Sequence, residues 1–187
     1  MNNIPQLPPI LDFNPDTNKG MLFDTRDGQS YRVVKIGNQI WLAENFRYLV
    51  LKEDELNSLD NFDFMKYGRF YDWYTASTIA PEGWRLSSNE DFLELKDFII
   101  KDNNLDDASK VHSYLKSKDS WKSNQGIDKY GFSVFPMVQN NKYSCRLRSS
   151  TISNDGLSYV LHFCETSYFD LDLTSTENLF SVRLLKI

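Results

Sequence analysis

Long apolar runs are missing from this chain, which bears on where the protein can reside. The longest weakly polar run, residues 156–164, is far shorter than the ~20 residues that a membrane-spanning helix needs. Residues 1–15 contain no Lys or Arg and carry four prolines, so they do not form an intact secretory signal. The sequence therefore predicts no membrane span. It leaves open a cytoplasmic protein and an exported protein whose signal was removed.

Basic residues are in the minority. The chain has 21 Lys and Arg against 26 Asp and Glu, a formal net charge of -5 at pH 7. Proteins that bind nucleic acid in general neutralise its phosphates with clustered Lys and Arg. No basic stripe with interleaved aromatic residues occurs, so we expect no nucleic-acid partner.

Catalytic and cofactor signatures are also absent. The chain contains no nucleophile elbow, no glycine-rich phosphate loop and no paired metal motif. Asp102-x-Asn104-x-Asp106 imitates the start of a calcium loop, but Asp107 replaces the required Gly and Ser113 replaces the bidentate Glu. The Glu-Pro-Asn and Trp-Asn-Asp triplets of calcium-dependent lectins are missing as well. We therefore predict no enzyme activity, no cofactor and no calcium-dependent sugar site.

Cysteine and histidine occur only twice each. If the turn at residues 153–156 is centred between its second and third residues, Cys145 and Cys164 lie directly opposite each other, within disulfide range. The sequence leaves open whether Cys145 and Cys164 form a disulfide or remain two thiols. His162 would share a face with Cys164, but three ligands without a paired-cysteine spacing are a weak zinc signal. We predict no metal site.

The composition of the chain predicts one domain that is preceded by an N-terminal arm. Residues 1–20 are rich in proline and predict an extended arm, and residues 21–187 predict a single domain. Two β-rich runs, residues 30–36 and 39–42, flank Gly-Asn and predict a hairpin. Aromatic residues make up 14% of the chain, enough to fill the core of a loop-rich fold or to line a binding face.

The stretch 81–92 contains a turn, a large aromatic residue and a helix start. Ser88 and Asp91 form a capping box, with Asp in place of Glu. Apolar residues then recur at helical spacing, which predicts a helix over about 88–100. We expect Trp84 to fix the entry of this helix to the core.

Helices and strands are grouped rather than alternating. A second, shorter helix is predicted over about 107–116. After it, the pattern favours strands at 131–136, 145–150, 159–164, 168–173 and 180–187. This order predicts an α+β fold.

Several segments, taken in chain order, resemble the Fibrobacter succinogenes major paralogous domain family. They are Asp24-x-Arg26-Asp27-Gly28, Tyr31-x-x-Val34-x-Ile36-Gly37-x-Gln39-x-Trp41-x-Ala43-Glu44-Asn45, Tyr67-Gly68-x-x-Tyr71-x-Trp73-x-x-Ala76, Pro81-x-Gly83-Trp84-Arg85-Leu86, Gly131-Phe132-Ser133, Ser149-Ser150-Thr151 and Phe180-Ser181-Val182-Arg183. The resemblance implies a C-type-lectin-like fold with small twisted antiparallel sheets, two helices, long loops and paired terminal strands. It also implies an exported or cell-surface protein of Bacteroidetes-type bacteria.

The chain departs from the pattern of the family at two positions that belong together. The resemblance implies one Cys just before Pro81 and another just after Arg183, where this chain has Ala80 and Leu184. Both are replaced, as expected if the implied pair forms one disulfide, because losing one Cys alone would leave an unpaired thiol.

The last third of the chain carries the predicted binding surface. Tyr, Asn and Arg side chains there suit adaptable contacts at low entropic cost. The predicted binding residues are Asn140, Tyr143, Arg146, Arg148, Tyr159, His162 and Tyr168. Strand alternation places Arg146 and Arg148 on one face. The alternative interpretation is that Tyr159 is core and both arginines are merely solvated. The residues predicted to be structural are Trp41, Trp73, Trp84, Arg85, Cys145 and Cys164.

The leading interpretation is a non-catalytic recognition module that presents this surface to a protein or glycan partner. One alternative is a structural component of a larger homo- or hetero-oligomeric assembly, such as an adhesin, a phage-type fibre or an injection-system tip. Another is a diverged enzyme related to formylglycine-generating proteins, which have a similar Gly-Trp-Arg-Leu element.

Overall fold

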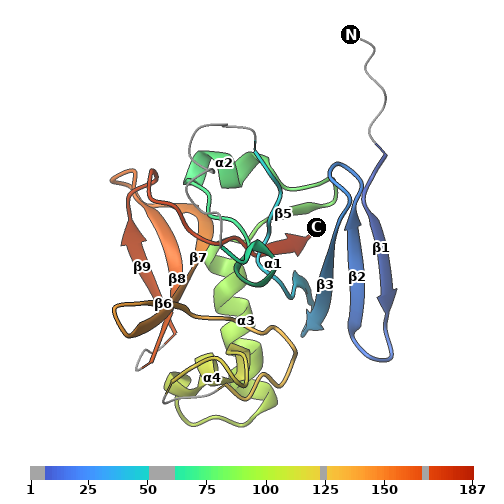
Figure 1. The fold of residues 1–187 in the computed structure, drawn as a ribbon. Coiled ribbons are helices and arrows are strands. Elements are labelled where there is room, and N and C mark those ends of the chain that lie inside the picture. Colours follow the sequence, from blue (N-terminus) through green and yellow to red (C-terminus); the bar gives the residue numbers. More distant parts are fainter. Residues whose placement is uncertain (1–6, 51–61, 123–125, 166–168) are drawn as a thin grey trace.

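The computed structural model describes residues 7–50, 62–122, 126–165 and 169–187. Within these ranges the fold is α+β, as the sequence predicted, with two antiparallel sheets and a few short helices (Figure 1). The first sheet has the order β1-β2-β3-β4-β10-β5, and the second has the order β6-β7-β8-β9. No helix in the described ranges is long and apolar enough to cross a membrane.

The elements have the following bounds. The strands of the first sheet are β1 (Ile10–Asn14), β2 (Lys19–Asp24), β3 (Gln29–Ile36), β4 (Gln39–Leu42), β5 (Trp84–Leu86) and β10 (Leu184–Lys186). Those of the second are β6 (Met137–Gln139), β7 (Lys142–Ile152), β8 (Ser158–Cys164) and β9 (Asp170–Thr174). The helices are α1 (Phe64–Tyr67), α2 (Trp73–Thr78), α3 (Asn89–Asp102) and α4 (Val111–Leu115), with a 3₁₀ turn at Ala108–Lys110.

The first sheet brings the two ends of the domain together. Strand β10 lies between β4 and β5, where Leu185 pairs with Trp41 and Leu184 pairs with Leu86. The predicted hairpin is present as β3 and β4, joined through Gly37 with φ +61°. A Cβ at this glycine would meet the ring of Phe98 at 2.8 Å, so glycine also lets α3 approach the turn.

Part of the predicted N-terminal arm, residues 1–20, belongs to the first sheet. Residues 10–14 form β1 and pair with β2, with Ile10 opposite Phe23 and Asn14 opposite Lys19. Leu11 and Phe13 pack against buried apolar residues of the first sheet, which explains why this stretch joins the sheet. Residues 1–6 of the arm lie outside the described residues.

Helix α3 begins as predicted. The backbone N–H of Asp91 donates to the Ser88 hydroxyl at 3.3 Å, and the backbone N–H of Ser88 donates to Asp91 at 2.7 Å, which completes the capping box. Arg85 adds a hydrogen bond to Asp91 Oδ1 at 2.7 Å and Trp84 is buried beside it. The entry of α3 is therefore held to β5 by both polar and apolar contacts.

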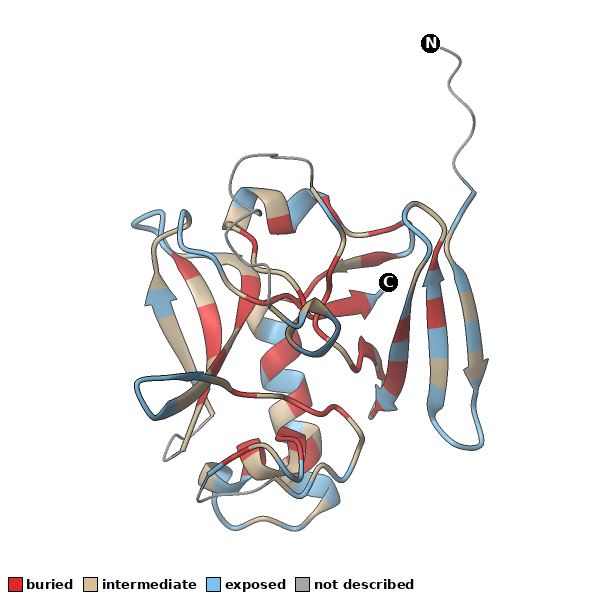
Figure 2. Cartoon of the chain, in the orientation of Figure 1, coloured by how far each residue is buried: buried red, intermediate tan, exposed pale blue. Residues whose placement is uncertain are grey.

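Two apolar clusters form the core (Figure 2). The first lies between the two sheets, around α3 and α4. Trp41 stacks on Phe92 there, with ring centroids 5.7 Å apart. The second cluster joins β2, β3, β5, β10 and the segment before α3. Ala80 and Leu184, which stand where the resemblance implies cysteines, both pack in this second cluster, so apolar contact holds the two segments together.

Three of the expected elements differ in the structure. The predicted strand at 180–187 is regular only over β10 (Leu184–Lys186), with isolated bridges at Phe180 and Ser181. The predicted strand at 131–136 is an irregular segment in which only Val134 forms a bridge, with Lys116. Ser133 has φ +52°, which does not fit a strand. The predicted helix at 107–116 is instead a 3₁₀ turn followed by the short helix α4.

Candidate functional site

The second sheet has a core-facing side and an outer side. On the core-facing side, Cys145 and Leu147 of β7 and Phe163 of β8 are buried in the first apolar cluster. Because side chains alternate along a strand, Arg146 and His162, directly opposite each other, lie on the outer side. The sequence prediction placed Arg146 on this side, but it placed His162 on the side of Cys145 because it assumed that Cys145 faces Cys164.

Three ionisable side chains form a row across the outer side. Arg146 on β7 pairs with His162 on β8, and His162 pairs with Asp170 on β9. Directly opposite residues in such a sheet have Cβ atoms about 4.5–5.5 Å apart. Asp172 on β9 extends the row, because its Oδ2 lies 2.9 Å from Nδ1 of His162. We call Arg146, His162, Asp170 and Asp172 the outer polar cluster.

The outer polar cluster holds a neutral imidazole between charges of both signs. Burial lowers the pKa of His162 and Arg146 lowers it further, against the opposing effect of Asp172. The neutral ring therefore carries its proton on Nδ1, donates to Asp172 and leaves an acceptor lone pair on Nε2. This Nε2 is buried and has no hydrogen-bond partner among the described residues. The cluster thus offers a guanidinium donor and two carboxylate acceptors around an oriented imidazole.

The remaining predicted binding residues divide among different environments. Asn140 is exposed in the turn between β6 and β7, with φ +50°. Tyr143 and Tyr159 are half-buried and belong to the core-facing side, since Tyr159 pairs with Leu173 and shares the face of Phe163. For the tyrosines, the interpretation as packing residues is therefore favoured. Tyr168 lies outside the described residues.

Arg148 is a correction to the predicted binding surface. It shares the strand face of Arg146, but its side chain is fully buried. Its Nε donates to Tyr71 O at 3.2 Å, its Nη1 donates to Ser158 Oγ at 2.6 Å, and its Nη2 donates to the Asn178 carbonyl. Burial lowers the pKa of Arg148 to about 10. A distant segment covers this end of the sheet, so Arg148 anchors that segment and cannot contact a partner.

The two cysteines are not directly opposite each other, so that prediction is wrong by one residue. Cys145 pairs with Phe163, and Cys164 pairs with Ser144. An irregularity in β7 between Arg148 and Ile152 shifts the register. The two cysteine side chains therefore lie on opposite sides of the sheet, and they form no disulfide. Burial raises the pKa of Cys145 to about 12.

The segments that carry the family resemblance meet in the interior around Arg183. Its Nε donates to Asn45 Oδ1 at 2.7 Å, and its Nη1 donates to the carbonyls of Leu42 at 3.1 Å and Phe132 at 2.7 Å. A fourth bond runs from Nη2 to Ser133 O at 3.2 Å. Burial lowers the pKa of Arg183 to about 10. These motif residues therefore organise the core and take no part in the outer polar cluster.

The tryptophans of the motifs are also interior. Trp41 has no exposed surface and donates from Nε1 to Gln39 Oε1 at 3.1 Å. Trp73 is half-buried and donates from Nε1 to Ser150 O at 3.2 Å, which ties α2 to β7. Within the described part of the chain, no three His, Cys, Asp or Glu side chains are grouped so as to hold a metal ion.

Comparison with protein-family models gives a match over most of the chain. A family model described as the Fibrobacter succinogenes major domain matches residues 34–186. No curated protein and no solved structure matches the chain. The match begins within β3, so β1 and β2 lie outside it.

Proposed function

The chain belongs to the Fibrobacter succinogenes major domain family, and from that premise we propose that it is a non-catalytic recognition module with a C-type-lectin-like fold. Two features support the fold. The C-terminal strand β10 pairs with β4 near the start of the domain, and α3 packs in the cluster between the two sheets. The ligand-binding surface in this proposal is the outer side of the second sheet.

The observation that carries the proposal is the row formed by Arg146, His162 and Asp170, with Asp172 hydrogen-bonded to the imidazole. A guanidinium presents donors in a rigid fork, and each carboxylate presents two acceptor oxygens. This combination suits hydroxyl groups of a glycan and polar groups of a protein segment. Asp170 is exposed and the side chain of Asp172 is 45% exposed, so both can reach a partner.

The row is poorly arranged for stabilising the sheet alone. A cross-strand ion pair stabilises a sheet when the opposite charges face each other directly. Here the guanidinium of Arg146 faces the imidazole of His162, and the carboxylates lie one strand further on. Among the described residues, Arg146 forms no ion pair. The guanidinium is therefore available to a partner.

The proposal is tested by screening the protein against a glycan array and a displayed random-peptide library. Each hit is re-measured with the double variant R146A/D170A and with the matched surface control K35Q/E94Q, whose two sites are exposed and lie on β3 and α3. A hit supports the proposal if it binds the control variant as tightly as the wild type and does not bind R146A/D170A. Hits that bind all three proteins equally, or no hits at all, contradict it.

A further inference from the structure

Strand β1 leaves one edge of the first sheet open. It pairs with β2 from Ile10 to Asn14 without a shift in register, and within the described ranges its backbone bonds to no other strand. In Figure 1, β1 lies at the margin of the molecule, on the far side of the first sheet from the second. A regular edge strand with no bulge and no Lys is a template for pairing with another chain. The outward N–H and C=O groups of β1 are therefore accessible to an added strand.

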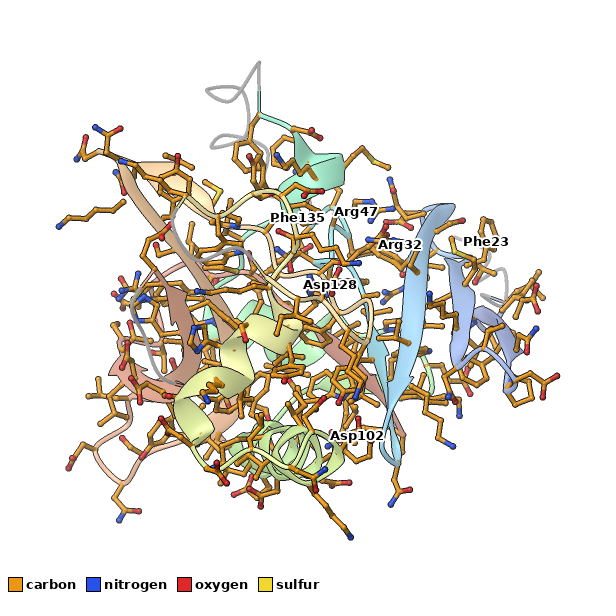
Figure 3. The ribbon with its side chains drawn as sticks, turned by 90° about the horizontal axis from the view of Figure 1, so that it is seen from below. Phe23, Arg32, Arg47, Asp102, Asp128 and Phe135 are labelled. Atoms are coloured by element: carbon orange, nitrogen blue, oxygen red, sulfur yellow. The ribbon has the colours of Figure 1, made fainter. Side chains whose placement is uncertain are left out.

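An apolar patch lies next to this open edge. Ile10 of β1 is directly opposite Phe23 of β2, and Met21 lies on the same side of the sheet, two residues along β2. Ile10 is 60% exposed, Met21 43% and Phe23 40%. Figure 3 shows Phe23 toward the outer margin of the molecule, with Arg32 further inward. Contiguous exposed apolar side chains mark surfaces that bind other proteins. We call these three apolar side chains, Asp12 and the backbone of β1 the β1 edge.

The opposite side of β1 is only partly covered. Leu11 and Phe13 pack on that side against the second apolar cluster, but both remain half-buried. A strand added beside β1 would cover them with its own apolar side chains and remove more apolar surface from water. Prolines border β1 at both ends, Pro8 and Pro9 before it and Pro15 after it, and proline has no N–H to donate. The added strand is therefore about as long as β1.

Asp12 gives the β1 edge a charge that selects its partner. It is exposed at the middle of β1 and forms no ion pair among the described residues. The cations on the same side of β2 and β3 are Lys19, which lies opposite Asn14, and Arg32, which pairs with Glu44. Both lie on the β2 side of Asp12. The position on the other side of β1 is therefore open to a cation from a partner strand.

A second copy of this chain fits the β1 edge poorly. Antiparallel pairing of two β1 strands about their middle residue would place Asp12 directly opposite Asp12 of the second copy. Like charges that face each other destabilise a sheet. Shifting this pairing by two residues in either direction brings Pro9 or Pro15 into the ladder, and proline lacks the N–H that a ladder uses. The β1 edge therefore suits a different chain, with a cation at the position that faces Asp12.

We propose that the β1 edge binds an extended segment of a partner protein, which adds a strand to the first sheet beside β1. Main-chain hydrogen bonds to β1 hold the segment, and its side chains supply the specificity. A Lys or Arg of the segment faces Asp12, and the apolar residues on either side of this cation face Leu11 and Phe13. A further apolar residue packs on Ile10 and extends the patch that Ile10 forms with Phe23. This surface belongs to the first sheet, whereas the outer polar cluster belongs to the second.

The probe for this proposal is a fluorescein-labelled peptide with the central sequence Thr-Val-Lys-Val-Ile. In the antiparallel orientation of the first sheet, this order places Lys opposite Asp12. Its counterpart carries Glu in place of Lys. In a fluorescence-anisotropy titration the Lys peptide should bind the wild type, and the Glu peptide should bind about fivefold more weakly or worse. D12K should reverse this preference, while the matched control E94K, whose site is exposed on α3, should keep it.

Pairing through the backbone has a signature of its own. Only every second N–H of an added strand points toward β1. N-methylation of one alternating set of residues in the Lys peptide should therefore abolish binding, and N-methylation of the other set should preserve it. I10S should weaken binding by about fivefold, because it removes an apolar contact. Both Asp12 and Ile10 are exposed, so D12K and I10S should unfold at the wild-type temperature.

R146A/D170A should bind the Lys peptide like the wild type, which separates this surface from the proposed function. No binding of the Lys peptide, equal affinity for the Lys and Glu peptides, or an equal effect of the two N-methylated sets overturns the proposal. Sedimentation of the protein alone gives the remaining test. A concentration-dependent dimer that I10S dissociates overturns the proposal in favour of a second copy at the β1 edge.

Discussion

Arg183 donates a hydrogen bond from Nε to Oδ1 of Asn45 at 2.7 Å, across a sequence separation of 138 residues. Asn45 also donates from Nδ2 to Tyr67 O at 2.8 Å. Three segments that carry the family resemblance are thereby joined at one buried point. Because this network consists of a guanidinium and mainly backbone carbonyls, it fixes the fold without needing any particular ligand.

The Arg183 network predicts a large loss of stability when the guanidinium is removed. R183M keeps much of the apolar side chain but leaves the acceptors on Asn45, Leu42, Phe132 and Ser133 without a donor. Each buried acceptor without a partner costs about 1–3 kcal/mol, so we expect a total of about 3 kcal/mol or more. Urea unfolding followed by tryptophan fluorescence measures the change. K35M at an exposed site is the control, and an R183M variant as stable as K35M would contradict this account.

Two features of Gly68 predict that it tolerates no side chain: its positive φ and the close approach of Asn45. It has φ +71°, and a Cβ there would lie 2.5 Å from Cβ of Asn45. Gly28 has φ +75° but nothing within 4 Å of its Cβ position. G28A should therefore lose only the backbone term of about 1 kcal/mol. G68A should lose clearly more, because Asn45 must move away from Arg183 and Tyr67.

Thermal unfolding of the two glycine variants checks this comparison. A melting temperature of G68A well below that of G28A is the expected result. Equal melting temperatures would show that Asn45 has room to shift at no cost, and that its contacts do not hold the fold.

Acid should destabilise the protein through His112. Its ring nitrogens have no hydrogen-bond partner among the described residues, and burial, followed by Lys116, lowers its pKa to about 4. An unfolded histidine has a pKa of about 6.5. Above that pH both states are neutral and stability is complete. As the pH falls from 6.5 toward 4, only the unfolded chain binds the proton, so the free energy of unfolding decreases.

The size of this acid effect is about 2 kcal/mol between pH 7 and pH 4.5. Comparing urea unfolding of the wild type and H112Q at both pH values isolates it, because the carboxylates titrate alike in the two proteins. H112Q should lose less stability on acidification than the wild type. The lowered pKa of His162 acts in the same direction and is unchanged in this comparison. An identical loss in both proteins would refute the assignment to His112.

The shifted register of β7 and β8 predicts that the cysteines stay unbridged. Intact mass measured without reductant should equal the reduced mass, because Cys145 and Cys164 lie on opposite sides of the sheet. Cys145 should also resist alkylation until the protein unfolds, since it is buried and burial raises its pKa to about 12. Peptide mapping after alkylation in native buffer and in urea distinguishes the sites. A mass lower by two hydrogen atoms would contradict the observed register.

Local signals in the sequence predicted the elements that local interactions determine. The capping box of Ser88 and Asp91 places the start of α3, and Gly37 places the β3–β4 turn, because each depends on contacts a few residues apart. The outer side of the second sheet was partly predictable for the same reason. Strand alternation placed Arg146 on a polar face, but the predicted register put His162 on the face of Cys145 and so missed its pairing with Arg146.

The features that the sequence did not predict depend on distant segments. Arg148 obeys the same alternation as Arg146, but its burial results from contacts with Tyr71 and Asn178, which no local pattern reveals. The cysteine register was missed because an irregularity in β7 leaves no periodic signal. Asp172 was missed as a member of the outer polar cluster, although its alternation with Asp170 on a short strand gave a usable signal.

The central claim is that the outer polar cluster is the recognition surface of this domain. The most direct test is a calorimetric titration of the strongest array or library hit into the wild type, R146A/D170A and K35Q/E94Q under identical conditions. The account predicts that the control retains the wild-type affinity and that R146A/D170A, while unfolding at the wild-type temperature, loses at least about 2 kcal/mol of binding free energy. A folded R146A/D170A that binds the hit as tightly as the wild type would contradict it.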